Sequence, residues 1–465
     1  MINRRRILSV LGALPAAGLA YQSPTPAKAA GHLPQRVLGR TGRWVVPYAF
    51  GGQASVQRTP DGIDPVDIVV RVVEQGVNYL DTANGYGPSQ VNMGQAFRRL
   101  KLRPHETGYD AALRERIFLA TKTGRRFAHA PGVAGPTAVE ELRRSLTQMF
   151  GDGEGFIPEG AYLDSIQIHN LSTMEQVEQV YQGYNERGGK MPEQIGALAA
   201  LIDYRDGTNY TGLNPERKKW VRHLGITGHL SSPVLMNAIQ RDTGDHLDTM
   251  LIALNANDRA YGAHQYNAIP AARAKGMGII AMKIFSDGTF YGKEARFSRN
   301  AADTYVQVGK AGAVDPADLV RYPLGVAGVS CAIVGIGKID RANAEKDQLV
   351  TNMTAALDGT VSDSEMLAIE KRVRARHGLD TNYFQDRHGL KQPTDVKAVK
   401  DGDRLRVTWQ TAFAGAEPIR TYDILAGGKK LASVPFRPQL TLEPLEFYVP
   451  AAEAGSGEIR VVAVA

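Results

Sequence analysis

Cysteine is almost absent from this sequence. Its 465 residues include a single cysteine, Cys331, which excludes an internal disulfide and a cysteine-rich metal site. Stability must come from the burial of apolar side chains, for which a chain of this length is ample. We therefore expect no bound metal.

Long apolar runs and a strong charge excess are also lacking. The apolar part of the opening stretch, MINRRRILSVLGALPAAGLA, is short for a membrane span, and no later run is longer. Arg4, Arg5, Arg6 and Lys28 account for four units of the formal net charge of +7, so the remaining chain is only slightly basic. No basic stripe interleaved with aromatic residues is present, which argues against a nucleic-acid partner.

The first 29 residues have the pattern of an export signal. A positively charged head precedes the apolar run, and the segment AKA at 27–29 fits a cleavage site for small residues. Arg4 and Arg5 stand in the frame of a twin-arginine signal. A membrane-anchoring helix is the alternative. We predict a signal peptide over residues 1–29 and an exported protein, periplasmic or extracellular, with no membrane span after its removal.

Short β-rich runs alternate with helical patterns from about residue 45 to residue 334. This arrangement predicts a parallel sheet with crossover helices. The runs are 45–50, 77–80, 117–120, 165–168, 223–226, 250–254, 278–282 and 331–334. Eight such units favour a closed TIM-type (β/α)₈ barrel over an open doubly wound sheet. We assign the barrel to residues 33–390.

Two intervening segments predict helices. In 137–150, Val139, Leu142, Leu146 and Met149 share one face at helical spacing. The segment 187–219 is longer than one crossover requires, so we expect it to carry an extra helix and a loop.

After about residue 392 the pattern changes to alternation with period two. In DRLRVTWQ, Leu405, Val407 and Trp409 would face inward, while Arg406 and Thr408 would face water. We therefore predict a small all-β sandwich over residues 393–465. The early tryptophan, the strand containing Tyr422 and the lack of a cysteine pair resemble a fibronectin type III module. Such a module would offer a surface for a protein or carbohydrate partner.

Polar residues follow three neighbouring runs of the predicted barrel. Asp81 comes after the second run, Lys122 after the third and His169 after the fourth, and Tyr86 follows Asp81 in a glycine-rich turn. Catalytic groups of parallel barrels project from the carboxyl ends of the strands. Singly, Asp81 could cap a helix, Lys122 could be solvated and His169 could belong to the core. Their occurrence at successive strand ends favours one shared site.

The chemistry of these four residues is mutually consistent. A tyrosine, whose ordinary pKa is about 10, is a weak acid at neutral pH unless a cation stabilises its phenolate. Lys122 can supply that cation, and Asp81 can keep the buried amine charged. His169 can donate a hydrogen bond to the oxygen that Tyr86 protonates. Such a site suits the reduction of a carbonyl group by hydride.

At these positions the sequence resembles the aldo/keto reductase family. GVNYLDTANGYGPSQ, IFLATKTG and LDSIQIHN are similar to the family's aspartate–tyrosine, lysine and histidine segments, and the likeness runs from VLGRTG at Val37 to about Val350. The resemblance implies a catalytic tetrad of Asp81, Tyr86, Lys122 and His169, with Tyr86 as the general acid.

The resemblance also implies a nicotinamide cofactor, NADPH with NADH as an alternative, bound without a Rossmann domain. No G-x-G-x-x-G motif opens an early βαβ unit here. Arg341 matches a position that contacts the 2′-phosphate, and Glu345 replaces the usual asparagine.

The segments that normally hold the nicotinamide amide are altered in this sequence. Thr227 keeps a hydroxyl, Asn255 could supply an amide, and Lys283 adds a cation after the seventh run. Lys283 could alternatively be a solvated residue of the barrel rim.

The sequence thus predicts an exported NAD(P)H-dependent oxidoreductase that acts on a small aldehyde or ketone, or on the corresponding alcohol. The alternative is a sensor or interaction protein that keeps a cofactor without turnover and recruits a partner through its C-terminal sandwich.

Overall fold

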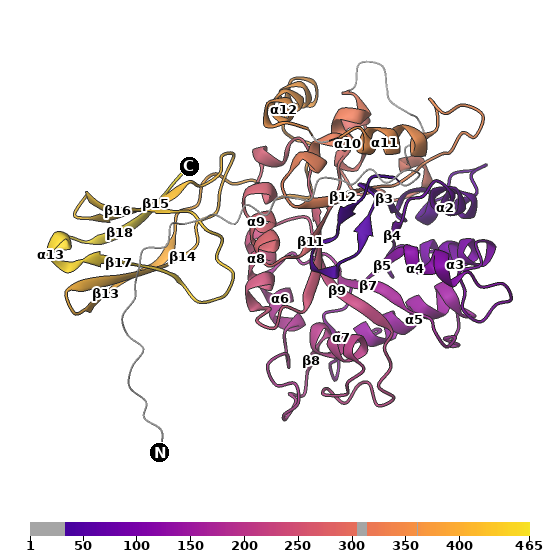
Figure 1. Ribbon diagram of the computed structural model, residues 1–465, viewed down its shortest axis with the longest axis horizontal. Helices are drawn as coiled ribbons and strands as arrows, with labels where there is room; N and C mark the ends of the chain where they lie inside the picture. Colours follow the sequence, from indigo (N-terminus) through magenta and orange to yellow (C-terminus); the bar gives the residue numbers. More distant parts are fainter. Residues whose placement is uncertain (1–32, 305–313, 360) are drawn as a thin grey trace.

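The computed structural model describes residues 33–304, 314–359 and 361–465. Parallel strands close into an eight-stranded barrel and follow one another around it in sequence order (Figure 1). The strands are β3 (Tyr48–Gly51), β4 (Tyr79–Asp81), β5 (Phe118–Thr123), β7 (Leu163–Ile168), β9 (Val221–Gly228), β10 (Leu247–Ala253), β11 (Gly278–Met282) and β12 (Val329–Val334). Each of the eight predicted runs overlaps one barrel strand, so the predicted (β/α)₈ barrel is confirmed.

The first predicted run, 45–50, is wrong as a single strand. Its first residue, Val45, ends β2 (Trp44–Val45), which pairs antiparallel with β1 (Arg36–Val37), and the barrel strand β3 begins only at Tyr48. The 3₁₀ turn η1 (Gly39–Thr41) joins β1 and β2. Gly39 has a φ of +49°, and a Cβ there would lie 2.2 Å from the backbone nitrogen of Gly278. The hairpin therefore packs tightly against the amino end of β11, at the floor of the barrel.

Helices surround the barrel, as Figure 1 shows. The longer ones are α2 (Pro65–Glu74), α3 (Ser89–Arg99), α5 (Ala138–Phe150), α6 (Met174–Val180), α7 (Ala197–Asp206), α8 (Ser232–Arg241), α9 (Ala268–Ala274), α10 (Pro316–Gly325), α11 (Gln348–Leu357) and α12 (Asp363–His377). Short elements are α1 (Ala54–Gln57), α4 (Ala111–Arg116), β6 (Phe127–His129), β8 (Ile195–Gly196), η2 (Asp258–Ala260), η3 (His264–Tyr266), η4 (Ser286–Tyr291) and η5 (Ala301–Asp303).

Local sequence explains where the predicted helices begin. The helix expected over 137–150 is α5, which starts after a capping box formed by Thr137 and Glu140. Leu142, Leu146 and Met149 are fully buried in the core, as predicted from their spacing, whereas Val139 on the same face is only partly buried against it. The extra helix expected within 187–219 is α7.

The C-terminal module, residues 393–465, consists of two antiparallel sheets. One contains β13 (Thr394–Asp401), β14 (Arg404–Gln410) and β17 (Leu445–Pro450), and the other contains β16 (Lys429–Pro435), β15 (Thr421–Ala426) and β18 (Ile459–Val464). The short helix α13 (Ala451–Ala454) follows β17. Val407 and Trp409 are buried in the module core, where the rings of Trp409 and Tyr422 lie 5.4 Å apart. The predicted small β-sandwich is confirmed.

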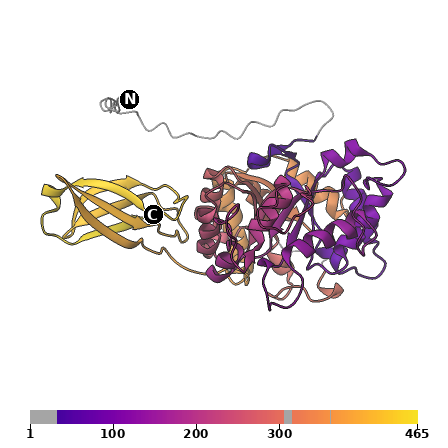
Figure 2. The ribbon, with the colours of Figure 1, turned by 90° about the horizontal axis from the view of Figure 1, so that it is seen from below.

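The module lies at one side of the barrel, beside α8 and α9 (Figures 1 and 2). Three barrel side chains donate hydrogen bonds to its backbone carbonyl groups: Gln240 to Gln439 at 3.1 Å, Arg259 to Ala416 at 2.8 Å and Asn267 to Ala414 at 3.0 Å. The Asn267 side chain also accepts a hydrogen bond from the Ala414 nitrogen at 2.8 Å. An ion pair between Arg259 and Glu417 completes the polar part of this contact.

The predicted signal peptide, residues 1–29, lies outside the described residues. Across residues 33–304, 314–359 and 361–465, no helix is both long and apolar enough to cross a membrane. Within the same ranges, no group of three or more His, Cys, Asp or Glu residues is arranged to hold a metal ion. Cys331 is buried in β12.

Candidate active site

Three neighbouring barrel strands bring the four predicted catalytic residues to one end of the barrel. Asp81 is the last residue of β4, Lys122 is the fifth residue of β5, and His169 directly follows β7. Tyr86 lies in the turn between β4 and α3. Because the carboxyl ends of parallel strands meet at one face of a barrel, these side chains gather there.

Lys122 is at the centre of the group. Its side chain is 1% exposed, and its Nζ is bonded to Asp81 Oδ1 and lies 2.9 Å from the Thr82 carbonyl oxygen. The same nitrogen lies 4.7 Å from the centroid of the Tyr86 ring. Burial lowers the pKa of Lys122, but the neighbouring Asp81 and Tyr86 outweigh it and hold the pKa above its usual value. The ammonium group therefore stays charged beside the phenol.

Tyr86 and His169 face each other in front of this cation. Their ring centroids are 5.7 Å apart and the rings are nearly perpendicular, at 81°. Burial raises the pKa of Tyr86, whereas Lys122 opposes that rise. Burial and the positive charges of Lys122, Arg126 and Lys283 lower the pKa of His169 to about 3. His169 is thus a neutral imidazole at ordinary pH, able to donate a hydrogen bond from a ring N–H.

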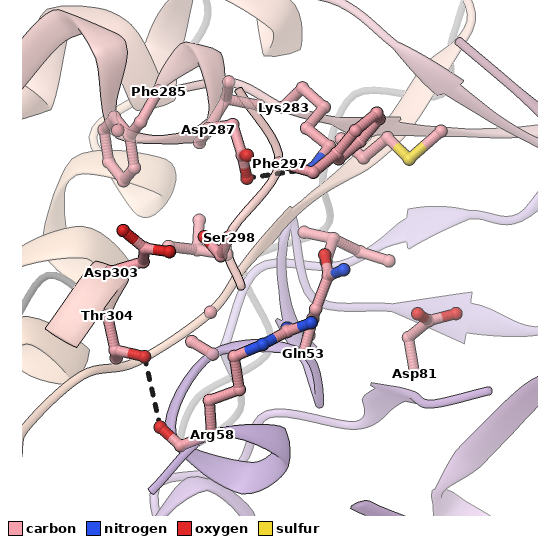
Figure 3. A pocket seen from close by; sticks show the side chains of 18 of the residues that line it. Gln53, Arg58, Asp81, Lys283, Phe285, Asp287, Phe297, Ser298, Asp303 and Thr304 are labelled. Atoms are coloured by element: carbon pink, nitrogen blue, oxygen red, sulfur yellow. Dashed lines mark hydrogen bonds and ion pairs between the residues drawn. The ribbon is translucent and has the colours of Figure 1, made fainter. Parts of the chain in front are cut away.

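A cavity of about 330 Å³ extends outward from this group. Asp81, Tyr86 and His169 line it, while Lys122 lies behind them. Its walls come from α1 and the residues on either side of it, the segment after β11, the end of β12 and helix α11. Residues from these four places include Gln53, Arg58, Lys283, Asp287, Phe297, Gly335, Gln348, Thr351 and Asn352. Figure 3 shows Arg58 opposite Lys283, Asp287 and Phe297, with Asp81 at one end.

Of the five predicted cofactor residues, only Lys283 lines the cavity. Its Nζ lies 2.9 Å from Asp287 Oδ1, so an acid already compensates its charge. Arg341 is about half exposed and forms ion pairs with Asp67 at 2.8 Å and Glu74 at 3.7 Å. The structure does not bring Arg341 to the cavity wall.

Thr227, Asn255 and Glu345 also lie away from the cavity wall. Thr227 is buried, and its hydroxyl oxygen accepts a hydrogen bond from the Asn170 nitrogen at 2.8 Å. The amides of Asn255 and Asn382 bond to each other at 2.9 and 3.1 Å. Glu345 is exposed in the loop before α11.

Several cavity residues were not predicted from the sequence. Gln53 lies just after the first barrel strand, so the strand-end argument that found Asp81 could have found it, whereas Arg58 lies beyond the short helix α1. Gln348, Thr351 and Asn352 recur at intervals of three and four on α11, a helical spacing that places them on one face.

The donor set of the cavity fits a phosphate-bearing dinucleotide. Arg58 is a cation for which the described residues provide no ion-pair partner; its guanidinium donates to the Gln57 side-chain oxygen at 2.7 Å. Gln53, Gln348 and Asn352 add amides, and Thr351 and Ser298 add hydroxyls. A cation and neutral donors around one cavity are what phosphate and ribose groups require.

The model of the aldo/keto reductase family matches residues 49–358. The chain belongs to the aldo/keto reductase family. It is therefore an oxidoreductase of the aldo/keto reductase type, and the four residues gathered at the mouth of its barrel lie inside the matched region.

Solved structures similar to this aldo/keto reductase include two family members. An aldo-keto reductase from Klebsiella pneumoniae in complex with NADPH is 18% identical, with 72% of this chain and 93% of that chain covered at a TM-score of 0.43. An aldo-keto reductase from Bombyx mori in complex with NADP is 16% identical, with 74% and 94% covered at a TM-score of 0.45.

Proposed function

We propose that this aldo/keto reductase is an exported enzyme that uses NADPH, or alternatively NADH, to reduce an aldehyde or ketone, with Tyr86 as the general acid. The observation that supports this most is the convergence of a phenol, a charged ammonium group, a carboxylate and a neutral imidazole at the inner end of one cavity. A reduced nicotinamide supplies a hydride to the carbonyl carbon when it is bound.

The residues of the chain would handle the proton and the growing negative charge. A carbonyl oxygen held between Tyr86 and His169 would receive a hydrogen bond from the Tyr86 hydroxyl and another from a ring N–H of His169. Tyr86 gives its proton to this oxygen as negative charge develops, and Lys122 stabilises the resulting phenolate. Asp81 keeps Lys122 charged, and because the pKa of His169 is about 3, the imidazole donates a hydrogen bond without carrying charge.

Absorbance of the purified protein in the reduced-nicotinamide band tests this function. After loading with NADPH, addition of a panel of aldehydes should bleach the band at a rate that depends on protein concentration. A bound cofactor that stays reduced with every aldehyde and ketone would instead favour the sensor alternative. Failure to bind either NADPH or NADH would overturn the proposal.

Arg58 supports binding of the cofactor phosphates within this proposal. A hydrogen bond to a charged group contributes roughly 1.5–3 kcal/mol, so Arg58→Gln should weaken NADPH binding by about 10- to 100-fold. Arg341→Gln is the matched control, and it should have a smaller effect because Arg341 is exposed and already paired with Asp67. Fluorescence titration with NADPH and NADH measures both.

The opposite result would identify a different phosphate contact. If Arg341→Gln caused the larger loss, and only for NADPH, the 2′-phosphate would reach the loop before α11, and Arg58 would lose its proposed role.

Export by the twin-arginine route is part of the proposal and is supported by residues 1–29. Replacing Arg4 and Arg5 together by lysine should leave the precursor in the cytoplasm, because that route requires the arginine pair. Cell fractionation and immunoblotting measure this. Unimpaired export of the variant would point to the general secretory route.

We also propose that the C-terminal module is of the fibronectin type III kind. Its two sheets and the contact between Trp409 and Tyr422 support this. A crystal structure of the full chain with another strand order in residues 393–465 would contradict it.

A further inference from the structure

The outer side of the cavity is covered by residues 283–304, here called the cover. Lys283, Phe285, Asp287, Phe297 and other cover residues line the cavity. At its far end, the Thr304 hydroxyl donates a hydrogen bond to the Arg58 carbonyl oxygen at 3.1 Å, across the cavity (Figure 3). The cover is thus joined to the residue that follows α1.

The near end of the cover is conformationally strained. Lys283, Ser286 and Asp287 have φ values of 57°, 48° and 55°. Residues other than glycine disfavour this left-handed region of backbone conformation. They keep such a conformation where surrounding contacts impose it. The contacts that hold these three residues therefore determine whether the cover keeps its shape.

Asp287 is the residue on which those contacts converge. Its carboxylate lies 2.9 Å from the Lys283 Nζ and 3.1 Å from the Lys293 Nζ. It also accepts a hydrogen bond from the hydroxyl of Tyr383 at 2.6 Å. Burial and the Asp287 carboxylate raise the pKa of Tyr383, so the phenol keeps its proton and donates it to this bond. The Tyr383 ring also packs edge-on against Phe297, with centroids 5.2 Å apart.

Tyr383 belongs to the last segment of the barrel domain in the sequence. Residues 378–388, here called the strap, run from α12 towards the C-terminal module. The Ser286 hydroxyl donates to the Thr381 carbonyl oxygen at 2.8 Å, which gives cover and strap a second contact.

The strap itself is fixed to the segment that follows β10. Asn382 exchanges hydrogen bonds with Asn255, and its backbone nitrogen donates to the Tyr261 hydroxyl at 2.9 Å. Gln385 donates to Asp258 at 2.7 Å. The buried Asn255 therefore anchors the strap, and the strap holds Tyr383 against the cover.

We propose that Tyr383 is a positioning residue that fastens the cover over the cavity through Asp287 and thereby slows the release of the dinucleotide. This inference rests on the proposed function, since it requires a dinucleotide in the cavity. Tyr383 touches neither Tyr86 nor His169 in this arrangement, so the chemical step does not depend on it. It links the rate of cofactor exchange to the segment that leads into the C-terminal module.

Tyr383→Phe tests the proposal because it removes only the hydroxyl and keeps the ring against Phe297. We expect the dissociation rate of NADPH, followed by stopped-flow fluorescence, to rise about tenfold or more, as expected for the loss of a hydrogen bond to a carboxylate. The rate of hydride transfer in a single turnover should stay unchanged. Without cofactor, hydrogen exchange of the amides in 284–292 should become faster. Tyr210→Phe, in which the replaced ring is 55% exposed, is the matched control and should change none of these.

A double variant shows whether Tyr383 acts through Asp287. Asp287→Asn alone should also speed NADPH dissociation, and adding Tyr383→Phe should then change the rate less than twofold. Independent effects of the two substitutions on the NADPH dissociation rate would overturn the proposal. An unchanged dissociation rate in Tyr383→Phe would also overturn it, whether or not amide exchange becomes faster. If the unaltered protein binds neither NADPH nor NADH, the proposed function fails. Unchanged amide exchange in Tyr383→Phe would overturn the fastening role of Tyr383, whatever the result for cofactor binding.

Discussion

Replacing Tyr86 by phenylalanine is expected to lower the rate of carbonyl reduction by at least about 10²-fold, the usual effect of losing a general acid. The substitution removes the proton donor and keeps the ring, so its contacts with Lys122 and His169 are preserved. Cofactor binding should therefore change little, and the loss should appear in kcat. Steady-state kinetics with an aldehyde substrate, together with NADPH titration, measures both effects.

Tyr210→Phe is a suitable control for this substitution as well, because Tyr210 lies on the surface. Undiminished turnover of Tyr86→Phe would remove Tyr86 from the mechanism. A large loss of NADPH affinity would mean that the phenol contributes to binding the cofactor.

Replacing Lys122 by methionine should abolish turnover and also destabilise the fold. Turnover fails because no cation remains to stabilise the Tyr86 phenolate. Stability falls because Asp81, only 3% exposed, is left as a buried charge without its partner, a situation that costs about 3–5 kcal/mol. Denaturant unfolding and steady-state kinetics separate the two effects.

The double variant Lys122→Met, Asp81→Asn is the informative companion. An amide at position 81 carries no charge, so most of the lost free energy of unfolding should return while the enzyme stays inactive. Activity in the double variant would show that the ammonium group is not required. Unchanged stability in Lys122→Met would show that Asp81 does not carry a buried charge.

The barrel and the convergence of the four candidate catalytic residues could be predicted because both follow from local pattern. Each barrel strand is a short apolar run, and residues at or just after the carboxyl end of such a run face the mouth of a parallel barrel. This rule led to Asp81, Lys122 and His169, whose convergence the structure shows. The turn that carries Tyr86 is only five residues beyond Asp81, so little chain separates the acid from its partners.

The contacts of the predicted cofactor residues could not be predicted in the same way, because their partners lie far away in the sequence. Asn255 stands where the strand-end rule expects a functional amide, yet Asn382, 127 positions later, takes up its hydrogen bonds. Arg341 pairs with Asp67 on α2, which no local pattern around residue 341 indicates. Arg58 and Asn352 enter the cavity through a turn and a helix face whose orientation depends on tertiary packing.

The contact between barrel and C-terminal module has a consequence for how this protein can diverge. Gln240, Arg259 and Asn267 all bind carbonyl oxygens of the module's main chain, a group that every amino acid carries. Mutations that alter exposed side chains of the module therefore leave these three bonds intact. Substitutions on the outer surface of residues 393–465 can therefore accumulate without loss of these three attachments to the barrel.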